Sequence, residues 1–410
     1  MTSFSRLRYA LKRKCADLLK ILFVAVLLFL LIDFFLGQKF IAIVKPAEPF
    51  RTWHPVYHHT LIPNYSGLGN WGTWSYPVCT DTEGFKVHCE RKRANTKTFD
   101  VAFIGDSFTE GLGVPYEKTL VGVVADEMPK LTFANLGVVS YSPSIYLAKL
   151  KELTRLGYRF KHIIVFVDIS DLYDESVRYD LHNDSIVVDK GEVFPVPFHS
   201  QLRRRVLHRL PLTGELYTQF RKLTGPRVIA AAPTVTVRRD PIVPASPLPE
   251  ASGSSEAAEE KNTQKNAQPK LGLDGAIYKR EYVVDEWTYN TQSSSYGSDG
   301  VFGTLTKMER VMNEVYLLAQ SQGAKLSVGV YPWPGQLMFD VEDSLHVRLW
   351  RQFCETRCAH FYNAFPAFFD LVKKNGLEPV IRDYFIAGDV HFNERGNEVI
   401  ARSILEAGIE

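Results

Sequence analysis

The chain has 410 residues, of which 45% are hydrophobic and 12% are aromatic. This is enough apolar material for one large domain or for two to three small ones. The 48 basic and 46 acidic residues leave a formal net charge of +2. The strongly basic balance that is typical of nucleic-acid-binding proteins is therefore excluded, and we expect no nucleic-acid partner.

A basic segment followed by an apolar run marks the N-terminus. Residues 18–36 of the sequence are almost wholly apolar, close to the roughly 20 residues that a membrane helix needs. Basic residues precede this run and stay on the cytoplasmic side of a membrane. They are Arg6, Arg8, Lys12, Arg13 and Lys14, with Lys20 just inside the start of the run. We therefore expect a cytoplasmic tail over 1–17 and a membrane anchor over 18–44, with everything after Lys45 outside the cytoplasm.

Two features qualify the anchor. Asp33 is the one acidic residue inside the run, and near its outer end it can reach the lipid headgroups. A cleaved signal peptide is the alternative interpretation, but no small-x-small cleavage pattern follows the apolar core. The sequence favours an uncleaved anchor.

Residues 45–96 are rich in Trp, Tyr, His and Pro, and we expect an irregular lead-in that packs on a domain. Its tryptophans Trp53, Trp71 and Trp74, with Trp333 further on, are expected to pack in the core or in a subdomain, although aromatic platforms for sugars are the alternative. Cys79 and Cys89 flank a hairpin-like loop that a disulfide can close. Cys354 and Cys358 would share one face of a helix, within bridging range. We therefore interpret these four cysteines as two local disulfides, which fit an oxidising compartment, rather than as zinc ligands. We expect no metal.

Strand and helix patterns alternate from residue 97 onward. Strands are predicted at FDVAFIG, LTFANLG and HIIVFVD, and helices at YEKTLVGVVADEM and PSIYLAKLKELTRLG. A Pro-, Ser-, Ala- and Glu-rich stretch over 226–270 cannot bury enough surface to order itself and is expected to be a disordered insert. Alternation then resumes with helices at LTKMERVMNEVYLLAQSQG, VRLWRQFCETRC, AFFDLVKKNG and ERGNEVIARSILEAG, and a strand at AKLSVGVYPWP. This order predicts one α/β/α domain over 97–408, built on a parallel sheet covered on both faces.

Ser107 follows the first of these strands directly, in FIGDSFTEG. Sites in open parallel sheets form beyond the carboxyl ends of the strands, where a nucleophile is useful. An ordinary helix cap at Asp106 or Ser107 explains the same letters.

The C-terminal GDVHFNERGN supplies what a serine nucleophile lacks. Asp389 and His391 are two residues apart, so in an extended segment their side chains point the same way. Histidine can remove the serine proton, and an acid partner holds the imidazole in the required tautomer. Asn393 is expected to cap the final helix. The sequence thus predicts Ser107, His391 and Asp389 as catalytic residues.

These two motifs together resemble the SGNH (GDSL-type) hydrolase superfamily, over about 99–171 and 305–408. The resemblance implies a three-layer fold with a flavodoxin-like parallel sheet and a serine esterase that needs no cofactor. It also implies an oxyanion hole made by Ser107, Gly137 in NLGVVSYS, and the third block. That block is usually Gly-x-Asn-Asp; here VDISD puts Asp168 in place of the glycine and Ser170 in place of the asparagine.

Membrane-tethered members of this kind resemble enzymes that add or remove acetyl groups on envelope polysaccharides. The resemblance implies a periplasmic domain on a bacterial inner membrane and an O-acetylated carbohydrate substrate. Two alternatives stay open. One is an O-acetyltransferase that works with a separate membrane protein, and the other is a non-catalytic glycan-binding protein with the same fold.

Overall fold

The computed structural model describes residues 3–44, 48–71, 74–90, 96–182, 186–189, 210, 212–213, 216 and 275–409. The chain divides into two compact units, which are treated separately here. The first combines Met1–Lys45 with Phe198–Gly272, and the second combines Pro46–Pro197 with Leu273–Glu410. The insert expected over 226–270 lies outside the described residues.

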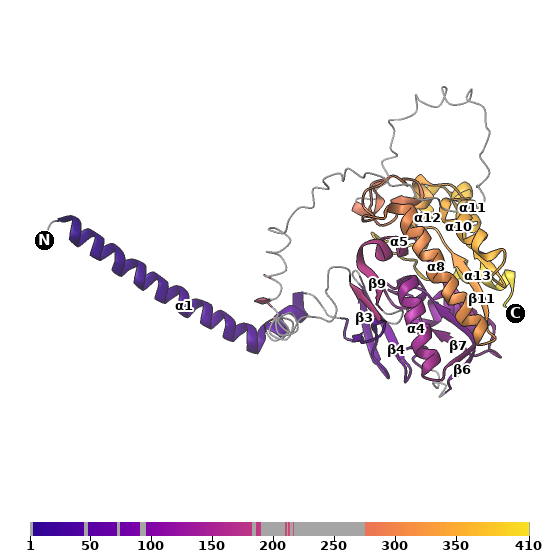
Figure 1. Ribbon diagram of the computed structural model, residues 1–410, viewed down its shortest axis with the longest axis horizontal. Coiled ribbons are helices and arrows are strands. Elements are labelled where there is room, and N and C mark those ends of the chain that lie inside the picture. Colours follow the sequence, from indigo (N-terminus) through magenta and orange to yellow (C-terminus); the bar gives the residue numbers. More distant parts are fainter. Residues whose placement is uncertain are drawn as a thin grey trace, which may run out of the picture. The chain divides into compact units, whose positions relative to one another are not determined.

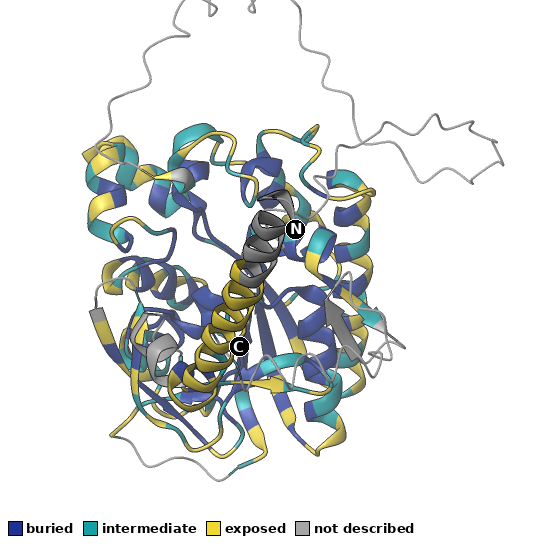
Figure 2. Cartoon of the chain, turned by 90° about the vertical axis from the view of Figure 1, so that its left-hand side faces the viewer, coloured by how far each residue is buried: buried dark blue, intermediate teal, exposed yellow. Residues whose placement is uncertain are grey.

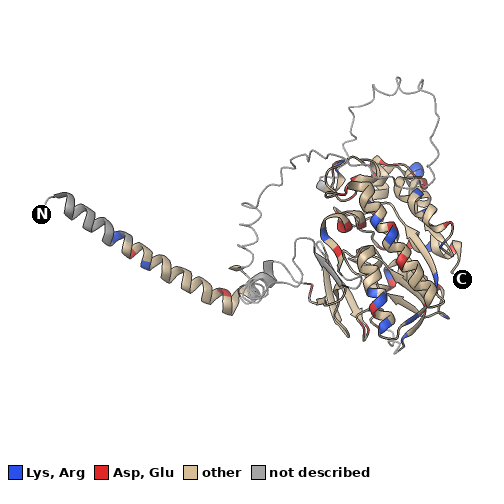
Figure 3. Cartoon of the chain, viewed as in Figure 1, with Lys and Arg blue, Asp and Glu red and all other residues tan. Residues whose placement is uncertain are grey.

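Helix α1 (Ser3–Val44) forms most of the described part of the first unit. Its span Ala16–Gly37 has a mean hydropathy of 2.8 and is long enough to cross a membrane, a test that a signal sequence also passes. Figure 3 shows a long uncharged stretch along this helix. The Asp33 carboxylate accepts hydrogen bonds from the backbone N–H groups of Leu212 and Thr213, both at 2.8 Å. Asp33 therefore has partners within the protein, and lipid headgroups are not its only possible contacts.

The second unit is built on a five-stranded parallel sheet, which confirms the predicted fold class. Its strands are β6 (Thr98–Ile104), β7 (Phe133–Asn135), β8 (Arg159–Phe166), β11 (Lys325–Val330) and β12 (Phe361–Asn363). They lie in the order β12-β11-β8-β6-β7. In chain order this is 2-1-3-4-5 read from the β7 edge, the flavodoxin-like arrangement, with its switch point between β6 and β8.

Continuous apolar runs explain why these strands lie at the centre. In β8 the last five residues are all buried, as expected of a strand covered on both faces. Parallel pairing sets Ala102 of β6 beside Ile163 of β8, and Val328 of β11 beside Val165. Figure 2 shows these strands as the buried centre of the unit.

Helices cover the sheet. Helix α4 packs against α8, side by side in Figure 1, and α3 packs against α13. The longer helices are α3 (Leu120–Glu127), α4 (Pro143–Arg155), α8 (Gly300–Ser321), α10 (Leu345–Cys354), α11 (Phe365–Asn375), α12 (Leu377–Tyr384) and α13 (Glu394–Ala407). The short ones are α2 (Ser107–Glu110), α5 (Asp171–Tyr173) and α9 (Pro334–Phe339). A hairpin of β9 (Tyr179–His182) and β10 (Ile186–Asp189) follows α5.

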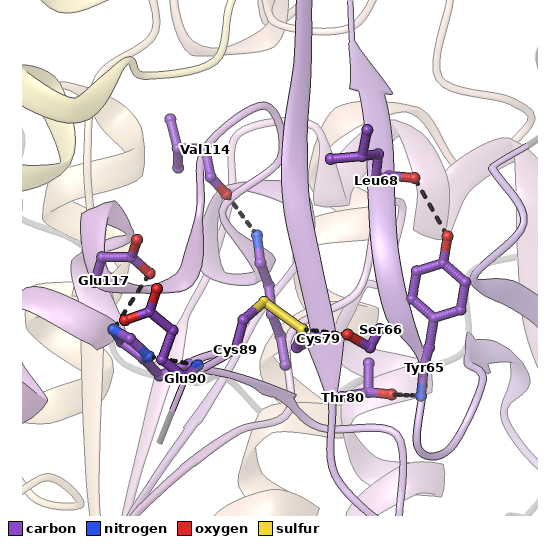
Figure 4. Close-up of a disulfide and its surroundings, with 11 residues drawn as sticks. Tyr65, Ser66, Leu68, Cys79, Thr80, Cys89, Glu90, Val114 and Glu117 are labelled. Carbon is purple, nitrogen blue, oxygen red and sulfur yellow. Dashed lines mark hydrogen bonds and ion pairs between the residues drawn. A yellow bond between two sulfur atoms is a disulfide. The ribbon is translucent and has the colours of Figure 1, made fainter. Parts of the chain in front are cut away.

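The expectation of an irregular lead-in is wrong. Its described residues form two small antiparallel sheets, β1 (Arg51–His54) with β2 (His58–Leu61), and β3 (Ser66–Trp71) with β4 (Trp74–Thr80) and β5 (Lys86–Val87). These strands are short, and β3 alternates exposed and covered positions around two glycines, so they lack the apolar runs of the main sheet. A disulfide between Cys79 and Cys89, as predicted, ties β4 to the segment after β5 (Figure 4).

The second disulfide also forms, although not on a helix face. Cys354 ends α10, and Cys358 lies in the turn that follows, with its N–H donating to the Cys354 carbonyl at 3.1 Å. The turn brings the two Cα atoms to 4.6 Å, closer than one helical turn would.

Candidate active site

The nucleophile turn begins where β6 ends. Gly105 is required there, because a Cβ at this position would lie 2.2 Å from Thr109 Oγ1 and 3.0 Å from the Phe166 carbonyl oxygen. Asp106 caps the following helix α2 by accepting the Phe108 N–H at 2.9 Å. Ser107 is therefore the first residue of α2, so the helix cap and the candidate nucleophile belong to one feature rather than being two alternatives.

The loop between α12 and α13 carries Asp389 and His391. A backbone bridge between Phe385 and Phe392 closes its base, and the Ile386 N–H donates to the His391 carbonyl at 2.8 Å. The segment is thus a tight turn rather than the extended strand that the spacing suggested. The Asp389 carboxylate bends back to accept the backbone N–H groups of Val390 at 2.6 Å and His391 at 3.1 Å.

Asn393 fixes the C-terminal side of this loop, as expected. Its side-chain oxygen accepts the N–H groups of Arg395 at 2.9 Å and Gly396 at 3.2 Å at the start of α13. Its amide nitrogen donates to the Phe385 carbonyl at 3.2 Å. The cap therefore joins both ends of the loop to one helix.

Ser107, His391 and Asp389 form a continuous hydrogen-bonded chain. His391 Nε2 lies 2.8 Å from Ser107 Oγ, and His391 Nδ1 lies 2.6 Å from Asp389 Oδ1. A charged carboxylate can only accept, so Nδ1 carries the proton and Nε2 is left to accept the serine proton. Phe108 stacks on the imidazole with ring centroids 4.6 Å apart and holds its plane.

The electrostatics keep Asp389 charged. Burial alone would raise its pKa, but the hydrogen bond and charge of His391, followed by the bond from Trp71, lower the pKa below its usual value. An ionised carboxylate at this position would stabilise His391 in its imidazolium form.

A second acid lies beneath the nucleophile. Ser107 Oγ is 3.1 Å from Asp106 Oδ2, and Asp106 Oδ1 also accepts the Tyr331 hydroxyl at 3.2 Å. Burial and the nearby Asp168 raise the pKa of Asp106 well above its usual range. Asp106, Asp168 and Asp171 form a buried group of three carboxyls. Sequence reasoning used Asp168 only as a missing glycine and did not find this group.

The three expected oxyanion donors have different surroundings. Ser107 and Ser170 both line the same cleft. The Ser170 hydroxyl donates to Asp168 Oδ1 at 2.5 Å, and the Gly137 N–H donates to the Asn135 side chain at 3.0 Å. Gly137 packs behind the nucleophile turn, since a Cβ there would lie 2.6 Å from the Glu110 nitrogen.

A cleft of about 300 Å³ opens at Ser107 and His391. Its walls include Tyr173, Tyr282, Trp333, Ser140 and the ion pair between Arg178 and Asp174, which are 3.0 Å apart. Another hollow, of about 320 Å³, lies between α3 and α13, and it shares no lining residue with the cleft at Ser107. It is lined by Val123, Glu127, Glu398, Arg402, Leu405 and Glu406.

The tryptophans divide between core and site. Trp333 is buried and donates its indole N–H to Asp168 Oδ2 at 2.8 Å. Trp53 is 67% exposed, so the expectation that it packs in the core is wrong. Trp71 lines the cleft and donates to Asp389 Oδ2 at 2.5 Å. No spacing or motif in the sequence connects Trp71 with Asp389.

The lead-in reaches the nucleophile turn as well. The Arg51 guanidinium makes two bonds to the buried Glu110 carboxylate. The Lys86 ammonium donates to the carbonyls of Gly111 at 2.7 Å and Val114 at 2.8 Å. Burial lowers the pKa of Lys86 to about 8, with Glu110 opposing the shift. Helix α2 and the residues after it are therefore contacted by the lead-in, in addition to their contacts with the main sheet.

The chain is structurally similar to GDSL-type lipolytic proteins and acetylxylan esterases. One match is a GDSL-family lipolytic protein from Veillonella parvula, at 12% identity and a TM-score of 0.36, covering 75% of this chain and 96% of that one. Another is an acetylxylan esterase from Geobacillus stearothermophilus, at 12% identity and a TM-score of 0.37, covering 76% and 95%. A third is a psychrotrophic esterase from Pseudoalteromonas, at 10% identity and a TM-score of 0.32, covering 76% and 96%.

Comparisons of sequence give no further relative. No family model matches the chain, and no curated protein matches it. Because the structural identities and TM-scores are low, the chemistry of this chain is inferred from its own side chains.

Proposed function

We propose that the chain is a membrane-anchored serine esterase that cleaves O-acyl esters of an envelope carbohydrate through an acyl-serine intermediate. The observation that carries this proposal is the hydrogen-bonded chain from Ser107 through His391 to Asp389. His391 Nε2 lies 2.8 Å from Ser107 Oγ, and His391 Nδ1 lies 2.6 Å from Asp389 Oδ1. Nucleophile, base and orienting acid are then all in place before substrate binds.

The reaction proceeds in two halves. Ser107 Oγ attacks the ester carbonyl carbon while His391 Nε2 takes the serine proton. The tetrahedral intermediate expels the sugar oxygen, which receives that proton from His391. Water then attacks the acyl-serine, again giving its proton to His391, and the carboxylic acid leaves as Ser107 is regenerated.

The oxyanion of each intermediate needs donors. We assign this role to the N–H groups of Ser107 and Gly137 and to the Ser170 hydroxyl. The Gly137 N–H can be shared between Asn135 and the oxyanion in a three-centre bond. The Ser170 hydroxyl can rotate away from Asp168 toward the cleft, since a hydroxyl hydrogen is free to turn.

A carbohydrate ester with a small acyl group fits the cleft. Aromatic faces of Tyr173, Tyr282 and Trp333 suit the apolar faces of sugar rings. The polar Ser140 and the Arg178–Asp174 pair offer donors and acceptors for hydroxyl groups. A volume of about 300 Å³ supports a short acyl group and a single sugar ring rather than a long lipid chain.

The location is part of the same proposal. The span Ala16–Gly37 would cross a bacterial inner membrane with its basic flank in the cytoplasm. The disulfides Cys79–Cys89 and Cys354–Cys358 suit an oxidising periplasm.

A fluorophosphonate probe applied to the full chain in detergent micelles tests the mechanism. We expect labelling of the wild type and of the control Ser294→Ala, which changes an exposed serine. Labelling should vanish in Ser107→Ala and fall sharply in His391→Ala. A folded wild type that stays unlabelled would overturn the esterase and favour a glycan-binding protein. For a labelled enzyme, an acetylated oligosaccharide with and without an acceptor glycan separates release to water from transfer to a hydroxyl.

A further inference from the structure

Trp71 reaches the loop that carries Asp389 and His391 from the lead-in, which belongs to the same compact unit as the triad. It is the last residue of β3 in the lead-in, and its indole N–H points at Asp389 Oδ2 from 2.5 Å, across 318 residues of sequence. We propose that Trp71 is a positioning residue of the active site, which fixes the Asp389 carboxylate so that its other oxygen faces His391. This inference rests on the proposed function of the triad.

The carboxylate needs a contact on each oxygen. Oδ1 accepts His391 Nδ1 and two backbone N–H groups, and Oδ2 accepts the Trp71 indole. The Asp389 side chain is 21% exposed, so water can compete for it. A carboxylate held on one side only can rotate about its last bond and take Oδ1 away from the imidazole. The indole donor removes this freedom.

Trp71 also touches the base itself. Its ring meets the His391 ring edge-on, with centroids 5.5 Å apart and planes at 84°. Together with Phe108, which stacks on the same imidazole, it leaves His391 aromatic contacts from two directions. One tryptophan therefore orients both the acid and the base.

The lead-in is built to hold Trp71 still. The residue pairs with Trp74 in the β3–β4 register, and the Cys79–Cys89 disulfide ties β4 down. On the other side, Trp71 packs against Gly113, where a Cβ would lie 3.4 Å from its ring. Gly113 belongs to the segment that follows the nucleophile helix, so Trp71 joins the serine block to the acid–base block.

The sharpest test replaces the N–H and leaves the ring. We would place 3-benzothienylalanine, which has sulfur where indole has N–H, at position 71 of the full chain, and compare it with Trp71→Phe. The matched control is the exposed Trp53 of β1, changed to Phe. We expect kcat on a small soluble ester to fall on the order of tenfold in both position-71 variants, the worth of one hydrogen bond to a charged group, with KM unchanged.

A pH profile separates positioning from packing. Losing the fixed carboxylate leaves the His391 imidazolium less stabilised, so the acidic limb of kcat/KM should move to lower pH in both position-71 variants. The Trp53→Phe profile should match the wild type. A benzothienyl variant with wild-type kcat and pH profile would overturn the proposal, even if Trp71→Phe were slow, since packing alone would then explain Trp71.

A spectroscopic readout keeps this test independent of esterase activity. The low-field proton signal of His391 Nδ1–H reports the bond to Asp389 directly. It should shift or broaden in the benzothienyl variant at constant pH. If wild-type Ser107 proved unreactive, the esterase would fail, while an altered His391 signal would still support the Trp71 role and an unaltered one would still refute it.

Discussion

Arg51 and Glu110 face each other in a two-bond ion pair, with Nη1 to Oε2 at 2.6 Å and Nη2 to Oε1 at 2.8 Å. The glutamate side chain is 1% exposed. It also accepts the Val139 N–H at 2.9 Å, so one carboxylate connects the lead-in, the nucleophile helix and the loop after β7.

Arg51→Met should destabilise the chain by about 3–5 kcal/mol, because it strands a buried carboxylate without its partner. Burial would raise the Glu110 pKa, but the charge and hydrogen bonds of Arg51, with Lys86, lower it below the usual value. This stabilisation is present above the unfolded pKa of about 4.3 and disappears as the pH falls through the lower folded pKa. The cost of Arg51→Met should therefore shrink in acid.

Urea unfolding at pH 7 and near pH 3 measures this dependence. Lys373→Met is the control, since Lys373 pairs with Asp370 and Glu342 at an exposed site, where an ion pair contributes little to stability. An equal loss for both variants would contradict the role given to the buried pair.

Asp171→Asn should stabilise the chain at pH 8 by on the order of 2 kcal/mol and leave it unchanged near pH 4. Burial, with the charges of Asp168 and Asp106, raises the Asp171 pKa well above its usual range. The folded state therefore favours the protonated acid. The contribution of protonated Asp171 to stability is fully present below the unfolded pKa of about 3.9, and it is lost as the pH rises toward the folded pKa.

Asparagine avoids this loss because it never ionises, and it can keep its oxygen toward the Tyr146 hydroxyl, which lies 2.8 Å from Asp171 Oδ2. Calorimetry over pH 4–8 gives the curve. A stability difference that is flat across this range would show that Asp171 ionises as it does in water.

Ser170→Ala should lower kcat on the order of 100-fold with little change in KM, if the hydroxyl stabilises the oxyanion. Ser294→Ala is the control, because Ser294 is exposed and does not line the cleft. Steady-state kinetics on a small soluble ester decide the case. Unchanged kcat in Ser170→Ala would leave the backbone donors alone to hold the oxyanion.

Asp389→Asn should reduce kcat on the order of 10⁴-fold while the fold is retained, because the amide supports the wrong imidazole tautomer. Circular dichroism checks the fold and single-turnover kinetics check the rate. A loss smaller than tenfold would mean that another group orients His391.

Gly113→Ala should lower kcat as well as the free energy of unfolding. Gly113 has φ of +83°, and an added Cβ would lie 2.6 Å from Ile386 Cδ1 and 3.4 Å from the Trp71 ring. Gly157→Ala is matched in backbone strain, with φ of +89°, but meets nothing within 4 Å. Both should lose about 1–3 kcal/mol, and only Gly113→Ala should also lose kcat. Equal kcat in the two variants would contradict the contact argument.

The sequence was sufficient for four strands of the main sheet, β6, β7, β8 and β11, because they lie in apolar segments that are preceded or followed by glycine or proline. It was insufficient for β12 and α12. The three residues of β12 are too few to show a period, and α12 follows α11 after the single residue Gly376. Short local signals of this kind take their structure from the sheet they join.

The candidate site divides in the same way. Ser107, Asp389 and His391 stand in motifs whose letters predict chemistry, and the structure brings the three side chains together. Trp71 stands in no motif, and Glu110 lies in FIGDSFTEG without a role that the motif predicts. Their partners are brought to them only by the tertiary packing of the lead-in, which no local pattern encodes.

The distance along the chain between Ser107 and His391 has a consequence for biosynthesis. A ribosome completes the serine block first and makes the histidine 284 residues later. At 5–20 residues per second this interval is on the order of tens of seconds. Throughout it the growing polypeptide would carry Ser107 without His391, so under the proposed mechanism the serine could not be activated before the last block is made.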